Sequence, residues 1–332
     1  MNQNALEKKK ILLVGLGRMG QRYLEFLTSK FPGSEIFVID NQVKQNLFKN
    51  FSLKQINDLQ SLEQNGLNFD LIIDAATTDG RLKRLNLYKT IGKQVFLEKP
   101  AFAFHQDVEA ASLLTDNELT DRVAVNYPWY YSRFHRFIRS ITKRKFLGEL
   151  ISVNFNCGAV GWSNIGGHNL AIFKQVTGNF PSISHAYLLK QNGNNPRGSE
   201  YIDFDGLVSG KTKSGVSFTH SSSVDCGIGV IENYNFENGY VLFDRVSGHF
   251  TLARRPNALK PHPTQYGRYK SVTQGKVKEI NIQDLLEDHL LAFLYQREHF
   301  TFCDATQVAL LISDAIRLSA RSLGNLDGYK VV

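Results

Sequence analysis

Two patterns of apolar and polar positions alternate over the first 126 residues. The run KILLVGLG at 10–17 is almost continuously apolar, as in a strand buried on both faces, and residues 19–31 then show helical spacing. The same patterns predict further strands at 35–40, 69–77, 94–100 and 121–128, and helices at 80–92 and 107–118. Repeated strand–helix units are typical of the α/β class, in which a doubly wound parallel sheet, a Rossmann fold, carries helices on both faces.

The pattern changes after Pro128. An amphipathic helix is predicted at 130–145, and the C-terminal part shows helical spacing again at 281–300 and 304–324. Between them, turns such as ENGY separate strand-like runs at 149–157, 184–190, 201–209, 215–223, 227–236 and 239–244. We therefore predict a dinucleotide-binding Rossmann domain at 1–126. An α+β domain with an open, mainly antiparallel sheet follows at 127–332, for substrate binding and oligomerisation.

Length and composition suit a globular protein of two domains. The chain has 332 residues, of which 42% are hydrophobic and 21% charged. No apolar run reaches the roughly 18–20 residues of a membrane span, and the short run after the N-terminal lysines ends in glycine, as a first strand does. We expect a cytoplasmic protein without a membrane partner. Its three widely spaced cysteines match no disulfide or zinc pattern and are expected to be buried or half-buried thiols.

The net charge narrows the choice of ligand. The formal charge is +8, but the basic residues are scattered and no nucleic-acid-binding motif accompanies them. The sequence therefore predicts no nucleic-acid partner. A positive field favours anionic small molecules, such as a dinucleotide or an acidic sugar derivative.

A glycine motif follows the first predicted strand. GLGRMG places Gly15, Gly17 and Gly20 in the Gly-x-Gly-x-x-Gly pattern, between a strand and a helix. Gly15 allows the tight turn, Gly17 lets the backbone approach a pyrophosphate, and Gly20 allows helix and strand to pack closely. Because the helix N-terminus adds free N–H groups, we expect this loop, with Arg18 and Met19, to bind a dinucleotide.

Asp40 ends the second predicted strand, twenty residues after the last glycine of the motif. An acid at this place accepts hydrogen bonds from ribose hydroxyls and repels the 2′-phosphate of NADP. Neither Asn41 nor Gln42 supplies a cation for that phosphate. The pattern predicts NAD as the cofactor, with the capping of a following helix as the alternative role of Asp40.

A second motif, FLEKP, places Lys99 at the carboxyl end of a parallel strand, where ligands bind in doubly wound sheets. A lysine there can hydrogen-bond a substrate hydroxyl and help to move its proton. The alternative is a surface lysine beside a turn proline. Further candidates for contact with the cofactor lie at the ends of the same set of strands: Ala76, Thr77, Glu98 and Asn126.

These motifs together resemble the Gfo/Idh/MocA oxidoreductases, named for glucose-fructose oxidoreductase and inositol dehydrogenase. The resemblance covers nearly the whole chain and rests on GLGRMG, EKP at 98–100, FLGELISV at 146–153, GGHNLAIFKQVTG at 166–178 and the closing helical segment. It implies a Rossmann domain, a second domain whose open sheet often forms subunit contacts, and NAD(P)-dependent redox chemistry on sugars and cyclitols. We therefore expect a homodimer or homotetramer assembled through the C-terminal sheet.

The chain departs from the family pattern in two places. A stretch similar to Asp-x-Gly-x-His-x-x-Asp, whose histidine and first aspartate work with the lysine, is here NIGGHNLA, which keeps His168 but has Asn164 and Ala171 in place of the acids. Asparagine can orient a hydroxyl but cannot take its proton. The family's Thr-Pro with a downstream histidine is here AATTDGRL, which changes the local loop.

The sequence leads to one main hypothesis and one rival. The first is an NAD-dependent oxidoreductase that transfers a hydride between nicotinamide and a secondary alcohol or ketone of a sugar, cyclitol or sugar derivative, with Lys99, His168 and Asn164 at the catalytic site. The rival is a catalytically silent sensor or partner protein of the same fold that binds a dinucleotide or sugar. It is motivated by Asn164, whereas the retained Lys99 and His168 favour the enzyme.

Overall fold

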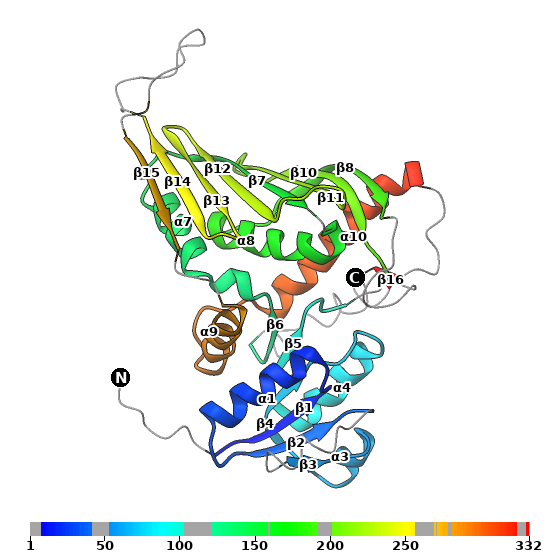
Figure 1. Ribbon diagram of the computed structural model, residues 1–332. Coiled ribbons are helices and arrows are strands. Elements are labelled where there is room, and N and C mark those ends of the chain that lie inside the picture. Colours follow the sequence, from blue (N-terminus) through cyan, green and yellow to red (C-terminus); the bar gives the residue numbers. More distant parts are fainter. Residues whose placement is uncertain are drawn as a thin grey trace. The chain divides into compact units, whose positions relative to one another are not determined.

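The fold is described from a computed structural model of the chain. It describes residues 8–41, 53–102, 121–158, 160–191, 201–255, 269, 271–277, 281–323 and 330–331. The residues form two compact units, Met1–Asn126 with Leu286–Ala309, and Tyr127–Leu285 with Leu310–Val332 (Figure 1). The helix predicted at 107–118 lies outside the described residues.

The first unit contains a parallel sheet of six strands. Their order is β3-β2-β1-β4-β5-β6. The order of the strands therefore reverses between β1 and β4, as it does at the ligand-binding crevice of doubly wound sheets. The strand bounds are β1 Lys10–Val14, β2 Glu35–Ile39, β3 Leu53–Gln55, β4 Phe69–Asp74, β5 Gly92–Glu98 and β6 Val123–Asn126. The predicted parallel sheet is confirmed, and the carboxyl ends of β1, β4, β5 and β6 lie at one edge of it.

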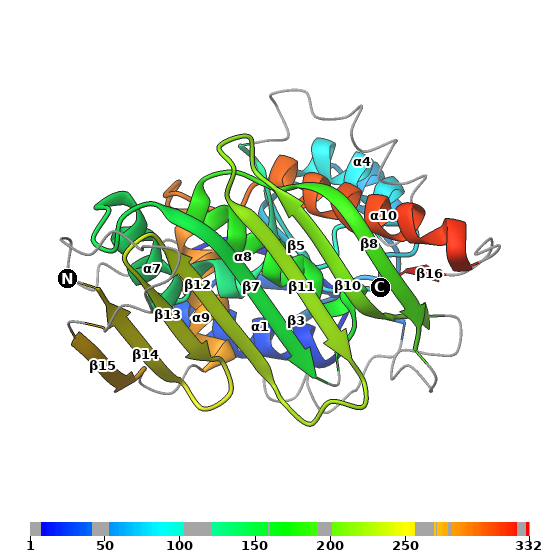
Figure 2. The ribbon, with the colours of Figure 1, turned by 90° about the horizontal axis from the view of Figure 1, so that it is seen from above.

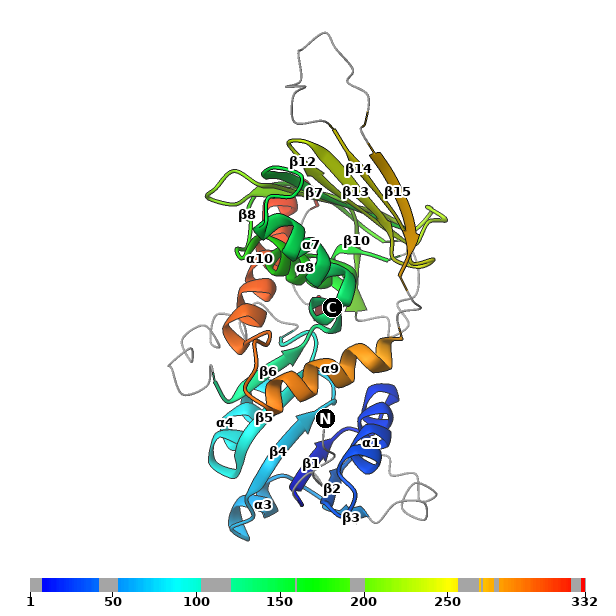
Figure 3. The ribbon, with the colours of Figure 1, turned by 90° about the vertical axis from the view of Figure 1, so that its left-hand side faces the viewer.

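Helices cover both faces of this sheet, with α1 (Arg18–Lys30) on one side and α4 (Arg81–Ile91) on the other (Figure 3). The short helix α3 spans Gln60–Gln64. The core on the α1 side joins apolar residues of β1, β2, β4 and α1 to Leu286, Leu290 and Phe293 of α9 (Ile282–Leu294).

The packing of α9 differs from the predicted domain division. Residues 127–332 were expected to form the second domain as one continuous segment, but 286–309 belong to the first unit. The reason is apolar burial, because Leu290 is fully buried and Phe293 is almost so. Phe293 also contacts the ring of Phe96 on β5.

The second unit contains an eight-stranded sheet in the order β15-β14-β13-β12-β7-β11-β10-β8 (Figure 2). Its strands are β7 Leu150–Gly158, β8 Ser182–Lys190, β10 Phe204–Lys211, β11 Ser217–Ser223, β12 Val230–Phe236, β13 Gly239–Asp244, β14 His249–Arg254 and β15 Ser271–Lys276. Neighbours are antiparallel except β7 and β11, which run parallel. The predicted open, mainly antiparallel sheet is confirmed. A separate two-stranded pair joins β9 (Tyr201–Ile202) and β16 (Lys330–Val331).

Helices lie against one face of the eight-stranded sheet. They are α7 (Arg133–Lys143), α8 (Gly167–Thr177) and the C-terminal part of α10 (Phe302–Leu323), all beneath the sheet in Figure 3. On β7, Val153 and Phe155 are buried while Asn156 is exposed, which is the alternation of a sheet covered on one side. Two short helical turns precede α7 and α8: η1 (Pro128–Tyr131) and η2 (Trp162–Gly166).

Candidate functional site

The glycine loop between β1 and α1 has the geometry that the motif predicts. Gly15 has φ +88°, and a Cβ there would lie 2.7 Å from the backbone nitrogen of Ala76. A Cβ on Gly20 would collide with the carbonyl oxygen of Gly15, so neither position has room for a side chain. A Cβ on Gly17 would meet no atom of the described residues within 4 Å. The loop is therefore tightly packed at two glycines and open at the third.

The start of α1 borders this open position. Gly17 is the N-cap residue, and no side chain among the described residues caps the helix. Arg18 is exposed and Met19 half-buried, and the Met19 sulfur lies 3.9 Å from the guanidinium of Arg22. Uncapped N–H groups beside open space are a suitable place for an anion.

Asp40 lies at the glycine loop. It follows the last residue of β2, Ile39, and its carboxylate accepts a hydrogen bond of 2.5 Å from the backbone N–H of Leu16. This contact places the acid next to the predicted dinucleotide loop. The helix that Asp40 was alternatively expected to cap falls on residues outside the described ranges.

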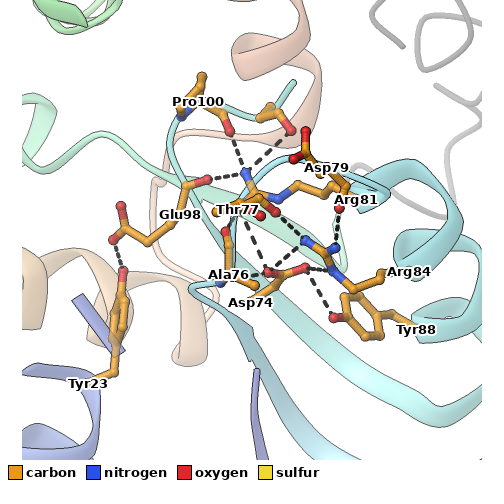
Figure 4. Close-up of polar contacts among 11 residues, drawn as sticks. Tyr23, Asp74, Ala76, Thr77, Asp79, Arg81, Arg84, Tyr88, Glu98 and Pro100 are labelled. Carbon is orange, nitrogen blue, oxygen red and sulfur yellow. Dashed lines mark hydrogen bonds and ion pairs between the residues drawn. The ribbon is translucent and has the colours of Figure 1, made fainter. Parts of the chain in front are cut away.

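The loop after β4 is built around a buried acid, Asp74. Its carboxylate binds the Arg84 guanidinium at 2.8 Å, accepts a hydrogen bond from the Tyr88 hydroxyl at 3.1 Å and lies 3.8 Å from Arg81 (Figure 4). The N–H of Ala76 also donates to it, at 3.1 Å. This network fixes the loop on which Ala76 is half-buried and Thr77 is exposed.

The motif Glu98-Lys99-Pro100 ends β5, with a cis bond between Lys99 and Pro100. Glu98 is buried, and it accepts hydrogen bonds from the Tyr23 hydroxyl and, at 2.6 Å, from the amide of Asn126. Burial raises the pKa of the Glu98 carboxyl, and these hydrogen bonds oppose the rise. Lys99 is half-buried. The structure thus brings together Glu98 and Asn126, both expected near the cofactor, and bonds their side chains to each other.

Four polar residues of this unit were not predicted from the sequence: Tyr23, Asp74, Arg81 and Arg84. A tyrosine within an apolar stripe predicts core packing, and an arginine at the start of a helix predicts a solvated surface. One feature could have drawn attention to Arg81. It lies in the segment AATTDGRL, where the chain departs from the family pattern.

Asn164 and His168 belong to the second unit, whereas Lys99 belongs to the first. Asn164 is half-buried within η2, and His168 is buried in the first turn of α8. The His168 ring makes an edge contact with Tyr127, with ring centroids 5.5 Å apart. Asn164 and His168 thus lie one helical turn apart along the chain.

A buried polar network anchors the next residue of α8. The Arg245 guanidinium donates to the side-chain oxygen Oδ1 of Asn169 at 2.9 Å and binds Glu232 at 2.6 Å. The Asn169 amide in turn donates to Nδ1 of His220 at 3.0 Å, and His135 contacts Glu232 at 2.8 Å. Nearby positive charge lowers the pKa of Glu232 to about 2 despite burial, and burial lowers that of His220 to about 3.

Two further observations concern the described parts of the chain. None of their helices combines the length and the apolar character needed to cross a membrane, and no group of three or more possible metal ligands occurs in them. Cys157 is buried, and Cys226 and Cys303 are half-buried, as predicted.

Comparison with known proteins finds similarity in structure. No protein-family model and no curated protein sequence matches the chain. A super-repressor mutant of Gal80p from Saccharomyces cerevisiae has a TM-score of 0.74 at 12% identity, covering 95% of this chain and 97% of that one. Levoglucosan dehydrogenase in complex with NADH and levoglucosan gives 0.74 at 12% identity, covering 95% and 98%. Myo-inositol 2-dehydrogenase from Lactobacillus plantarum gives 0.70 at 15% identity, with the same coverage.

These solved structures are of the Gfo/Idh/MocA type, and the likeness extends over nearly the full length of each chain. The fold expected from the sequence motifs is therefore confirmed: this chain has the Gfo/Idh/MocA fold.

Proposed function

We propose that the protein is an NAD-dependent oxidoreductase acting on a secondary alcohol or ketone of a sugar, cyclitol or sugar derivative. The observation that carries the proposal is the glycine loop, where Gly17 leaves open space beside the uncapped start of α1. Pyrophosphate fits such a place because it needs close backbone approach and free N–H donors. A solved structure with this fold, levoglucosan dehydrogenase, is in complex with NADH.

Asp40 supports NAD over NADP. Its carboxylate is held at the loop by the Leu16 N–H. A negative charge beside the adenosine ribose accepts hydrogen bonds from two hydroxyls but repels a 2′-phosphate. When bound, NAD supplies the hydride acceptor, and NADH the donor, for the redox step.

The chain's own groups handle the proton in this proposal. Lys99 and His168 are proton-handling partners: in alcohol oxidation the single hydroxyl proton passes to His168 while the hydride leaves, with Lys99 as its electrostatic partner, and in reduction the same groups return the proton. Asn164 orients the hydroxyl through its amide and takes no proton. Net positive charge favours anionic sugar derivatives among the candidate substrates.

The first test is a titration of the purified protein with NADH and with NADPH, followed by nicotinamide fluorescence. We expect NADH to bind and NADPH to bind at least about tenfold more weakly, because the Asp40 charge meets the 2′-phosphate. Equal or tighter binding of NADPH would refute the role of Asp40, and binding of neither would refute the dinucleotide site.

The second test is turnover of Lys99→Ala with sugars and cyclitols that the parent oxidises. We expect unchanged NADH affinity and a loss of about 10²–10⁴ in kcat, the usual contribution of an acid–base group. Lys93→Ala is the matched control, because Lys93 lies at the other end of β5, where it pairs with Asp70 at 2.7 Å. Equal turnover of Lys99→Ala and the parent would remove Lys99 from the mechanism.

Asn164 favours a second candidate function, a silent sensor or partner protein that binds a dinucleotide or sugar. An amide stands where the resembled family has a proton-handling acid, and one solved structure with this fold is a super-repressor mutant of Gal80p. The variant Asn164→Asp decides between the two. If it oxidises sugars while the parent does not, the silent function is correct.

We also propose that the open face of the eight-stranded sheet mediates a homodimer or homotetramer. Tyr187 and Leu207 pair across β8 and β10 with exposed side chains, whereas the next residue, Leu188, is buried and its backbone N–H donates to Ser319 of α10. Exposed apolar side chains grouped on one face are typical of an interface. Sedimentation should show a smaller species for Tyr187→Asp and no change for Val246→Asp, which alters an exposed apolar residue in a turn.

A further inference from the structure

We propose that Arg81 is a positioning residue that fixes the backbone turn carrying Lys99. The inference rests on the proposed function, in which Lys99 handles the substrate proton. It is drawn entirely from contacts within the first unit, which Figure 4 shows.

The Arg81 guanidinium holds the turn on both sides of Lys99. One of its terminal nitrogens donates to the carbonyl oxygen of Glu98 at 2.6 Å and also to that of Pro100, with Ala101 at 3.4 Å. The other donates to the Ala76 carbonyl at 2.7 Å. Arg81 therefore connects the loop after β4 to the turn after β5, and Lys99 lies between the bonded carbonyls.

Few other side chains can make these contacts. The guanidinium is planar and carries five N–H donors that point in several directions at once, whereas an ammonium is a single compact charge. Arg81 is 1% exposed, so these bonds are shielded from bulk water. Carbonyl groups left without a donor in the interior destabilise the conformation that buries them.

A buried acid makes the arrangement electrostatically possible. Burial lowers the pKa of Arg81, and Asp74, at 3.8 Å, opposes that change. Asp74 is itself held by Arg84 and by the Tyr88 hydroxyl. The charge that supports Arg81 is thus fixed independently of the Lys99 turn.

Arg84 provides a matched comparison. It binds the same carboxylate as Arg81, at 2.8 Å, and donates to the carbonyl oxygens of Thr77 and Asp79, both at 2.6 Å. Both of these acceptors lie in the loop that precedes α4. Removing Arg84 therefore disturbs Asp74 and that loop, whereas Arg81 itself donates to the main-chain carbonyls on both sides of Lys99.

The experiment uses the full chain as Arg81→Gln, Arg81→Lys and Arg84→Gln, and it needs no substrate. Amide hydrogen exchange of peptides covering 96–102 reports the turn, and acetic anhydride labelling of Lys99 between neutral and alkaline pH reports the lysine's environment. We expect Arg81→Gln to accelerate exchange in the turn at least about tenfold and to shift the labelling profile of Lys99. Arg81→Lys should lie between this variant and the parent.

Arg84→Gln should lower thermal stability but change both readouts much less than Arg81→Gln does, because its side chain makes no bond to the carbonyls of Glu98 and Pro100. Identical exchange and labelling in the Arg81 and Arg84 variants, or no change in Arg81→Gln, would overturn the proposal. If Arg81→Gln does not fold, Arg81→Lys decides in the same way. A confirmed shift together with full turnover of Lys99→Ala would refute the proposed role of Lys99 and leave the positioning by Arg81 intact.

Discussion

Two glycines of one loop differ in what a side chain would meet. At Gly20 an added Cβ collides with the Gly15 carbonyl, and at Gly17 it enters open space. We predict that Gly20→Ala lowers the melting temperature by several degrees. The loop and α1 must move apart to admit the methyl group, and this strain costs about 1–3 kcal/mol. Thermal unfolding followed by circular dichroism measures this effect.

Gly17→Ala should leave the melting temperature near that of the parent and weaken NADH binding at least about tenfold, because the methyl group takes the room that a pyrophosphate needs. The two variants together separate a packing role from a binding role. Loss of stability in Gly17→Ala, or undiminished NADH affinity, would contradict this assignment.

At the residue scale, the predictions of site residues came from motifs. Gly15, Asp40 and Lys99 could be proposed because each belongs to a short pattern with a physical reason for its spacing. Tyr23 and Arg81 could not, because their partners are backbone or side-chain groups far away in the chain. A pattern of local periodicity holds no information on such pairs.

At the element scale, the buried network joins α7, α8, β11 and β12 beneath the sheet. Arg245 can only donate, so the side-chain oxygen Oδ1 of Asn169 accepts from it, and the side-chain nitrogen Nδ2 of Asn169 donates to His220 Nδ1. His220 is therefore neutral, with its proton on Nε2. The pKa of His220 is about 3 in the folded chain, against 6.5 for an ordinary histidine.

This difference predicts a dependence of stability on pH. Below pH 6.5 the unfolded chain protonates this imidazole and the folded chain does not, so the free energy of unfolding falls as pH falls, until about pH 3. His220 alone should contribute roughly 1.4 kcal/mol per pH unit. Urea unfolding at pH 7 and pH 5 should show a smaller decrease for His220→Gln, and equal decreases would contradict the prediction. The pKa of buried His289 is also lowered, but this residue contributes equally to the pH dependence of the parent and of His220→Gln.

The elements themselves were predictable only where burial imposes a clear pattern. The strands β1, β2, β4, β5 and β6 were identified because they form nearly continuous apolar runs, whereas the short and partly exposed β3 was not. Strands β14 and β15 were not, since β15 is largely exposed and polar. The parallel pairing of β7 with β11 also escaped prediction, because turns suggest hairpins and carry no sign of a longer crossover.

At the scale of the whole molecule, the chain returns to its first unit. Leu286, Leu290 and Phe293 complete the core on the α1 side of the parallel sheet. We predict that a fragment of residues 1–126 is unstable, because this apolar surface is then open to water. Heteronuclear NMR of the fragment should show poor dispersion, improved by adding a peptide of residues 281–310. A well-dispersed spectrum of the fragment alone would contradict this view.

That return could not be inferred from the sequence. The α9 segment has the same helical spacing whichever core receives it, so its pattern predicts a helix and leaves its neighbour open. Contacts between residues so far apart in the chain depend on how the side chains of the two segments pack together. Local hydrophobic spacing does not specify that packing.

The way in which Arg81 holds its turn has a consequence for how the protein can change. Its acceptors at Glu98, Pro100 and Ala101 are all main-chain oxygens, which every amino acid supplies. Mutation at Lys99 therefore leaves in place the main-chain oxygens that accept hydrogen bonds from Arg81. An engineer could install a histidine, tyrosine or cysteine there and have each presented from the same backbone. New chemistry can be explored at this position without rebuilding the scaffold beneath it.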